Sequence, residues 1–187
     1  MKSRFTKVNT PLDGLYRIER KPIVDPRGFL CRIHCESEFS QMGLDPHPSQ
    51  INHTLTNGKG TVRGLHFQFP PHCESKLVSC LEGEIWDVVV DLRCDSPTFL
   101  HWHAEILSSE NQTSLYVPKG CAHGFQAMKE RCQLLYLHNH SYAPDKEGGL
   151  NPMDPKLGID WPLPVKELSE RDEKHPKIEN NFEGLEV

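Results

Sequence analysis

The segment Lys76–Leu92, KLVSCLEGEIWDVVVDL, contains two apolar runs that are separated by Glu82-Gly83. Each run has the length of a β-strand and is rich in the Val, Leu and Ile residues that favour extended backbone. Gly83 is a turn-forming residue, so Glu82-Gly83 marks a turn between the two runs. The segment therefore predicts two short strands, joined by a turn, near the middle of the chain.

The same pattern of short apolar runs and turn residues continues in both directions from this segment. We expect strands over 15–20, 28–33, 49–56, 61–68, 76–81, 85–92, 100–107, 113–117, 122–128 and 134–138. One short helix is expected over 37–42, with Ser37 as its N-cap and Gly43 as its stop. Many short strands at this spacing are typical of an all-β fold, an antiparallel β-sandwich or jelly-roll barrel with a few short helices.

The part of the chain after Tyr142 has a different composition. Pro and Gly become frequent, and only 168–172 has the pattern of a short helical turn. Residues 143–187 contain too few apolar side chains to form a domain, so we expect this tail to wrap around the barrel. The chain of 187 residues is thus predicted to be a single domain, 1–187.

Composition narrows the class of protein. A net charge of −5 and the lack of a basic stripe with interleaved aromatic residues disfavour nucleic-acid binding. The chain contains no run of about 18 apolar residues, so the sequence predicts no membrane-spanning helix. The seven cysteines contain no CxxC pair, and no hydrophobic signal core follows Met1. We therefore expect a cytoplasmic protein with reduced cysteines.

Two motifs resemble the metal-binding pattern of cupin barrels. Gly60 precedes His66 by six positions, and Pro118-Lys119-Gly120-Cys121-Ala122-His123 matches the later half of the pattern. However, Gln68 stands where the second histidine is expected, and Glu74 is too far along the chain to complete the set. Because an amide oxygen is a poor substitute for imidazole at a transition-metal site, we predict no metal and no other cofactor. The pair His101 and His103 is expected to face solvent or an interface.

Five side chains on four predicted strands have the chemistry needed to remove a proton beside a carbonyl group. They are Arg63, His66, Lys76, His123 and Tyr136. A histidine can act as the base, a lysine can stabilise the developing enolate, and a tyrosine can donate a proton on the opposite face. Strict strand alternation places His66 with Gly64 and Gln68, away from Leu65 and Phe67. Each side chain alone also suits a structural role, so the residues by themselves indicate only a β-barrel with a polar pocket.

Segments that span nearly the whole chain, in order, resemble the dTDP-4-dehydrorhamnose 3,5-epimerase family and its nucleotide-sugar epimerase relatives. They are 25–29 (DPRGF), 50–54 (QINHT), 60–68 (GTVRGLHFQ), 76–78 (KLV), 83–93 (GEIWDVVVDLR), 96–99 (SPTF), 117–125 (VPKGCAHGF), 154–162 (DPKLGIDWP) and 168–172 (LSERD). The resemblance implies a cupin-like barrel without metal, usually a homodimer in which the N-terminal strands within 1–50 are exchanged.

The resemblance also implies a role for each matching residue. His66 is expected to be the general base with Asp172 as its carboxylate partner, Lys76 the enolate stabiliser and Tyr136 the opposing acid. The residues expected to bind the nucleotide-diphosphate sugar are Arg27 and Phe29 from the exchanged strand, Gln50, Asn52, Arg63, His123 and Tyr142. The activity implied is epimerisation at C3, C5 or both of a 4-keto-6-deoxyhexose in deoxysugar biosynthesis, including dTDP-rhamnose for polysaccharides.

Two segments depart from the family pattern. Residues 69–75 lack the usual Pro-Gln-Gly type of turn before the lysine, and 148–153 lack the usual tryptophan. Both are expected at the mouth of the pocket, so the sugar, the nucleotide and the number of inverted carbons stay open. Two alternatives also stay open, a metal-dependent cupin enzyme and a non-catalytic sugar-nucleotide-binding barrel.

Overall fold

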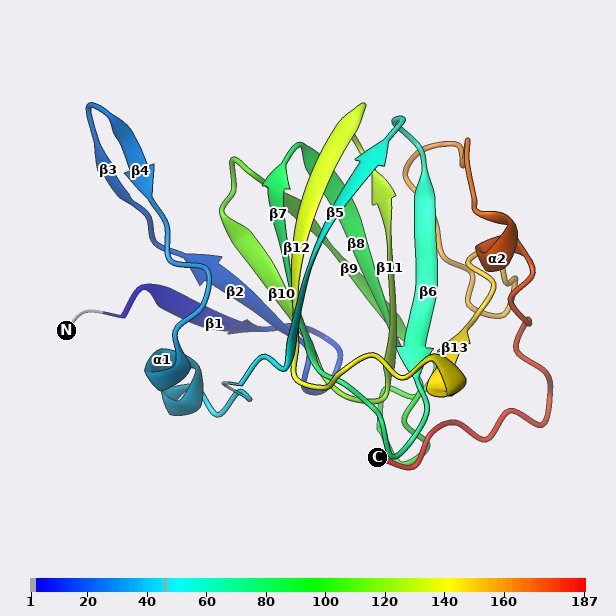
Figure 1. Ribbon diagram of the computed structural model, residues 1–187. Coiled ribbons are helices and arrows are strands. Elements are labelled where there is room, and N and C mark those ends of the chain that lie inside the picture. The colour runs from blue at the N-terminus through cyan, green and yellow to red at the C-terminus, as the bar shows by residue number, and fades with distance from the viewer. Residues whose placement is uncertain (1–2, 46) are drawn as a thin grey trace.

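Two antiparallel β-sheets face each other in the computed structural model, which describes residues 3–45 and 47–187 (Figure 1). The first sheet has the order β1 (Phe5–Asn9), β2 (Tyr16–Arg20), β10 (Thr113–Val117), β7 (Lys76–Glu82), β12 (Arg131–His138) and β5 (Gln50–Asn57). The second has the order β13 (Glu147–Gly149), β6 (Val62–Gln68), β11 (Cys121–Ala127), β8 (Glu84–Asp91) and β9 (Trp102–Ser108). This arrangement confirms the predicted all-β sandwich.

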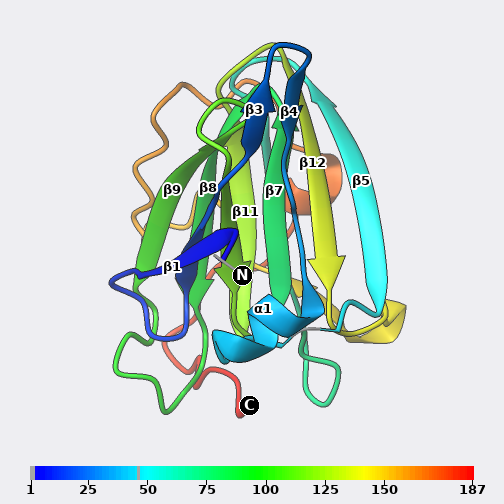
Figure 2. The same ribbon diagram turned by 90° about the vertical axis from the view of Figure 1, so that its left-hand side faces the viewer.

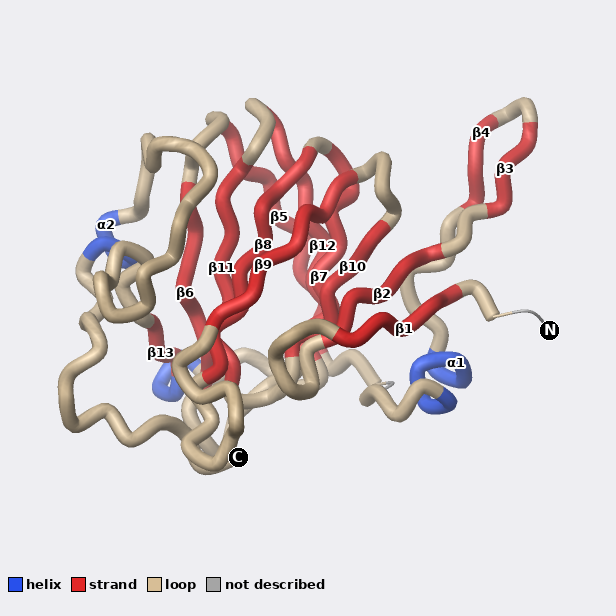
Figure 3. The backbone as a smooth tube through the Cα atoms, turned by 180° about the vertical axis from the view of Figure 1, so that it is seen from behind, coloured by secondary structure: helices blue, strands red, loops and turns tan. Residues whose placement is uncertain are grey.

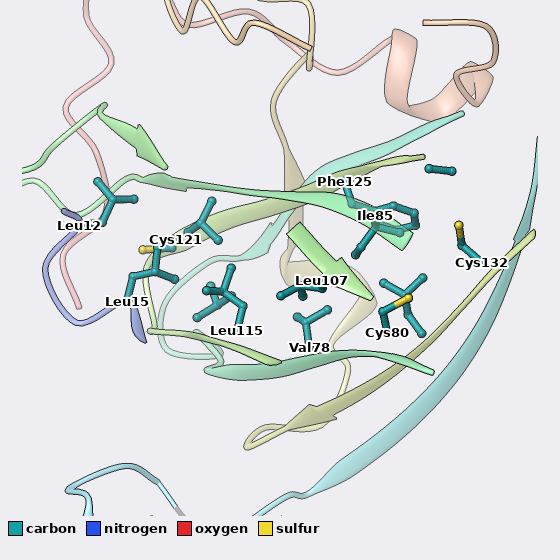
Figure 4. Close-up of a cluster of buried hydrophobic side chains, with 14 residues drawn as sticks. Leu12, Leu15, Val78, Cys80, Ile85, Leu107, Leu115, Cys121, Phe125 and Cys132 are labelled. Carbon is teal, nitrogen blue, oxygen red and sulfur yellow. The ribbon is translucent and has the colours of Figure 1, made fainter. Parts of the chain in front are cut away.

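The main core lies between the two sheets, where alternate residues of each strand point inward. Val78, Leu115 and Leu134 of the six-stranded sheet pack with Ile85 and Phe125 of the five-stranded sheet (Figure 4). All five are almost completely buried, at 2% exposure or less. Burial of such side chains contributes on the order of 2 kcal/mol each, so this cluster holds the sheets together.

The outer faces of the sheets are covered by different parts of the chain. Phe39 of α1 (Glu36–Gln41) packs against Leu77 and Leu137 on the outer face of the six-stranded sheet. The tail covers the five-stranded sheet, where Leu157 and Ile178 belong to the cluster of that outer face. Figure 3 shows this tail as irregular loops with the short helix α2 (Glu170–Glu173). In the described tail, the turn η1 (Pro144–Lys146) precedes β13, and α2 is the one helix or strand that follows it.

Each of the ten segments predicted as strands overlaps a strand of the structure, and the differences are confined to the strand ends. Three short strands were not predicted, namely β1, β3 (Ile23–Asp25) and β13. They are only three to five residues long, and none contains an apolar run of the usual strand length. The N-cap prediction was wrong: Cys35 caps α1, and Ser37 lies in the first turn, where its hydroxyl lies 3.4 Å from the Cys35 thiol. No helix among the described residues is long and apolar enough to cross a membrane.

A hairpin of β3 and β4 (Gly28–Leu30) extends away from both sheets (Figures 1 and 2). Val24, Phe29 and Leu30 on this hairpin are 63–73% exposed. Large apolar side chains at such exposure, gathered on one hairpin, are typical of a surface that another chain covers.

Candidate active site

A cavity of about 310 Å³ lies between the two sheets next to the apolar core, with which it shares Phe125. The six-stranded sheet lines it with inward residues of β5, β7 and β12, and the five-stranded sheet lines it with β6 and β11. Along β7 and β12 the inward positions are apolar at Val78 and Leu134 but polar at Lys76, Tyr136 and His138. The strand alternation that builds the core therefore also places the polar groups in the cavity.

Eight of the eleven predicted site residues line this cavity. They are Gln50, Asn52, Arg63, His66, Lys76, His123, Tyr136 and Tyr142. Asp172 lies behind His66 and contacts it directly. Only Arg27 and Phe29 are not brought to the cavity of their own chain, because both lie on the projecting hairpin, where Arg27 pairs with Asp25 at 2.6 Å.

The first catalytic candidate is the pair formed by His66 and Asp172. The Nε2 atom of His66 lies 2.7 Å from Oδ1 of Asp172, which comes from α2 in the tail. Donation of the Nε2 proton to this carboxylate leaves Nδ1 with the free electron pair that a base requires. The guanidinium of Arg171 lies 3.0 Å from the same Nε2 atom and also contacts Glu147 at the mouth of the cavity.

The environment of Asp172 favours its charged form. Burial alone would raise the pKa of Asp172, but the hydrogen bond and charge of His66, with the Gly64 N–H, lower it to about 2. Ser169 caps α2 by accepting the Asp172 N–H, which fixes the aspartate at the first turn of the helix. The carboxylate therefore stays ionised and can stabilise an imidazolium on His66.

A second imidazole–carboxylate pair lies deeper in the cavity. His123 of β11 is opposite His66 on the neighbouring strand β6, and its Nε2 atom lies 2.7 Å from Oδ1 of Asp87 on β8. Asp87 is fully buried, and burial raises its pKa despite the neighbouring His123. The other oxygen of Asp87 has no hydrogen-bond partner among the described residues.

Tyr136 and Lys76 enter the cavity from the opposite sheet. Burial, together with the charge of Asp87, raises the pKa of Tyr136, so its phenol stays protonated at neutral pH. The ammonium of Lys76 is buried and lies 3.1 Å from Glu74 and 3.5 Å from the backbone oxygen of His66. The base candidate and the acid candidate thus belong to facing sheets, and a cationic group contacts the backbone of the base.

The alternation expected for β6 is interrupted. His123 pairs with His66, but two residues later Phe125 pairs with Arg63, so β6 has one extra residue between the two pairs. This bulge allows Arg63, three positions from His66, to line the same cavity. The predicted separation of His66 from Leu65 and Phe67 is confirmed, because both apolar side chains belong to the cluster on the outer face, although Phe67 also borders the cavity.

Several functional candidates were missed from the sequence. Asp87, Glu74, His138 and Arg171 all contact a predicted site residue or line the cavity. Asp87 offered a signal, because it is a charged residue at an inward position of the apolar strand 84–91. No sequence signal indicated the contact of Arg171 with His66, because this contact depends on where the tail folds back onto the five-stranded sheet.

The residues considered for a cupin metal site are engaged in other contacts. The amide of Gln68 binds backbone atoms of His72 and Ala143, and Glu74 binds Lys76 and His138. Within the described part of the chain, one group of three potential metal ligands is found, His66, Asp172 and His175. The positive charge of Arg171 beside His66 makes this group a poor fit for a cation. His101 is exposed, and His103 lies 2.9 Å from Glu105, outside the cavity.

Comparison with known proteins agrees with this chemistry. The family model described as dTDP-4-dehydrorhamnose 3,5-epimerase matches residues 9–180. The dTDP-4-dehydrorhamnose 3,5-epimerase of Methanothermobacter thermautotrophicus is 36% identical over 182 residues, covering 96% of this chain and 97% of that protein. The dTDP-4-dehydrorhamnose 3-epimerase of Streptomyces niveus is 37% identical over 163 residues, covering 87% of this chain and 78% of that protein.

A solved structure extends the similarity to the fold. The dTDP-6-deoxy-D-glucose-3,5-epimerase of Legionella pneumophila, in complex with dTDP-4-keto-L-rhamnose, superimposes with a TM-score of 0.88 at 37% identity, covering 92% of each chain. The chain belongs to the dTDP-4-dehydrorhamnose 3,5-epimerase family.

Proposed function

We propose that this protein is an isomerase that inverts C3, C5 or both in a dTDP-linked 4-keto-6-deoxyhexose. One observation carries the proposal: the His66–Asp172 pair and the Tyr136 phenol enter one cavity from opposite sheets, with Lys76 beside them. Inversion of a carbon needs a base on one face of the sugar and an acid on the other, which this arrangement provides.

Each of these residues has a separate role in the proposed reaction. The Nδ1 atom of neutral His66 removes the proton from the carbon next to the keto group, and the ionised Asp172 stabilises the imidazolium. The ammonium of Lys76 stabilises the negative charge that develops on the keto oxygen. Tyr136, held protonated by burial, returns a proton to the carbon from the opposite face.

The rest of the cavity suits a nucleotide-diphosphate sugar. Arg63 provides a guanidinium that can bind a diphosphate oxygen pair, and His123 lies deeper, toward the sugar. Gln50, Asn52 and Tyr142 line the open side, where Tyr142 donates its hydroxyl to Glu147. We assign the sugar to the inner part and the nucleotide to this open side.

The hairpin residues Arg27 and Phe29 contribute to the proposed site only in a homodimer. Val24, Phe29 and Leu30 are exposed on a hairpin that leaves its own barrel, and Ile51 is 59% exposed on the edge strand β5. Exchange of the hairpins between two protomers buries these apolar groups and brings Arg27 and Phe29 to the nucleotide end of the partner's cavity. Light scattering of the purified protein tests this, since a monomer mass contradicts it.

The experiment that tests the reaction is incubation of dTDP-4-keto-6-deoxyglucose with the enzyme in D2O, followed by mass spectrometry. Two deuterons incorporated into the sugar identify epimerisation at both C3 and C5. One deuteron identifies a mono-epimerase, the activity named for the Streptomyces niveus relative. No deuterium with this sugar, or with the same sugar on other nucleotides, contradicts catalysis and leaves a binding barrel.

A further inference from the structure

The ammonium of Lys76 is held by an acidic residue that the catalytic scheme above does not use. Glu74 lies two positions before Lys76, in the loop that leads into β7, and its Oε1 atom is 3.1 Å from Lys76 Nζ. The side chains are only 9% and 8% exposed. A lysine on a flexible four-carbon stem has many rotamers, so a buried counter-ion decides where its charge sits.

The second oxygen of Glu74 is also occupied. Oε2 lies 2.9 Å from Nδ1 of His138, whose side chain is 11% exposed. His138 is directly opposite Lys76 in the β7–β12 pairing, so the two side chains lie on the same face of the sheet. Because both oxygens are bound, the Glu74 carboxylate is fixed and its Oε1 stays directed at the lysine.

The contacts of His138 determine which of its two ring nitrogens carries the proton. Asn52 Nδ2 lies 3.5 Å from Nε2 of His138, and the ring of Tyr136 stacks on the imidazole at a centroid distance of 5.9 Å. An amide N–H that donates to Nε2 places the imidazole proton on Nδ1, where it is donated to Glu74. A chain of contacts thus leads from Asn52 through His138 and Glu74 to Lys76.

The charge of Glu74 agrees with this geometry. Burial alone would raise the pKa of Glu74, but the hydrogen bond from His138 and the charge of Lys76 hold it below its usual value. A buried ammonium without such a partner would lose its charge or move toward water. The Glu74 carboxylate is therefore a charged partner for the Lys76 ammonium.

We infer that Glu74 and His138 are positioning residues that hold the Lys76 ammonium where the enolate oxygen forms. This inference rests on the proposed function. It predicts that Glu74→Gln lowers kcat roughly tenfold or more while KM changes less than about twofold, because the lysine loses its placement but the sugar keeps its binding groups. Activity is measured as deuterium incorporation into dTDP-4-keto-6-deoxyglucose, and folding by thermal melting of each variant.

Two further variants separate positioning from structure. In His138→Asn the side-chain amide replaces Nδ1 and can still donate to Glu74, whereas His138→Leu removes the donor. We expect His138→Leu to lose kcat as Glu74→Gln does, and His138→Asn to recover most of that loss. The matched control is Glu82→Gln at the other end of β7, which removes a carboxylate that meets Arg131 at 3.1 Å on the surface. This control keeps wild-type kcat.

A double-mutant cycle completes the test. If Glu74 acts through the lysine, Glu74→Gln causes no further loss of kcat in a Lys76→Met background. An equal loss in both backgrounds, or unchanged kcat in Glu74→Gln, overturns the inference while wild-type turnover still supports the proposed function. A wild-type enzyme that incorporates no deuterium overturns both.

Discussion

The cavity contains two imidazole–carboxylate pairs with the same contact distance and opposite electrostatic environments. His66 Nε2 lies 2.7 Å from Asp172, and His123 Nε2 lies 2.7 Å from Asp87. The pKa of Asp172 is lowered to about 2, whereas burial raises the pKa of Asp87. Distance alone therefore does not identify the catalytic pair.

The difference has a structural cause. Asp172 is bound by the Gly64 N–H as well as by His66, so hydrogen bonds stabilise its charged form. Asp87 is completely buried and its second oxygen lacks a partner in the described residues, so its charge is costly. The first pair suits a base that must gain and lose a proton, and the second suits a fixed group that binds the sugar.

The largest expected effect comes from removing each imidazole. His66→Ala removes the general base and is expected to lower kcat at least ~10²-fold. His123→Ala removes a binding group, so we expect mainly a higher KM and a kcat loss of roughly tenfold. Turnover and deuterium incorporation measure both, and unchanged turnover in His66→Ala would exclude the mechanism.

The carboxylates provide a sharper contrast. Asp172→Asn leaves no negative charge to stabilise the imidazolium, and we expect kcat to fall about 10²-fold. Asp87→Asn replaces a costly buried charge by a neutral amide of the same size, and we expect a loss of about tenfold or less. Steady-state kinetics with thermal melting compares the two, and equal losses would contradict the assignment of different roles.

The same two aspartates affect the pH dependence of stability with opposite signs. The folded pKa of Asp172 is below the usual 3.8, so its contribution is complete above about pH 4 and is lost as pH falls toward 2. The folded pKa of Asp87 is raised, so ionisation of Asp87 lowers the free energy of unfolding as pH rises above 3.8. Urea unfolding from pH 3 to 5 should show a flatter profile for Asp172→Asn and a steeper rise with pH for Asp87→Asn. The reverse order would refute the assignment.

The smallest expected effect concerns the support of Asp172. Ser169 accepts the Asp172 N–H at 3.1 Å, and Ser169→Ala removes this cap of α2 at a cost of about 0.5–2 kcal/mol. No corresponding cap supports Asp87, which is held by the ladder of β8. We expect a lower melting temperature and a loss of kcat smaller than that of Asp172→Asn. A kcat loss without any change in melting temperature would point to a direct role of the hydroxyl.

The His123–Asp87 pair and the His66–Asp172 pair also differed in how well the sequence predicted them. His66 and Asp172 were paired only through the family resemblance, since they lie 106 positions apart in the chain. Asp87 and His123 lie on adjacent strands β8 and β11, two positions out of direct register, since His123 pairs with Val89 and Asp87 with Phe125. Asp87 was missed because the apolar residues around it indicated core. Arg63 reaches the cavity through a bulge in β6, which no simple alternation predicts.

The sequence by itself determined the strands, the turns between them and the inward alternation of apolar residues. These depend on neighbouring residues, whose spacing fixes which face of a strand is buried. Only the tertiary structure decided which inward polar residues meet: the Glu74–His138 contact, the return of the tail to His66 and the opposite environments of two equal pairs. Burial and hydrogen-bond partners set the charge of a side chain, and both come from segments far apart in the chain.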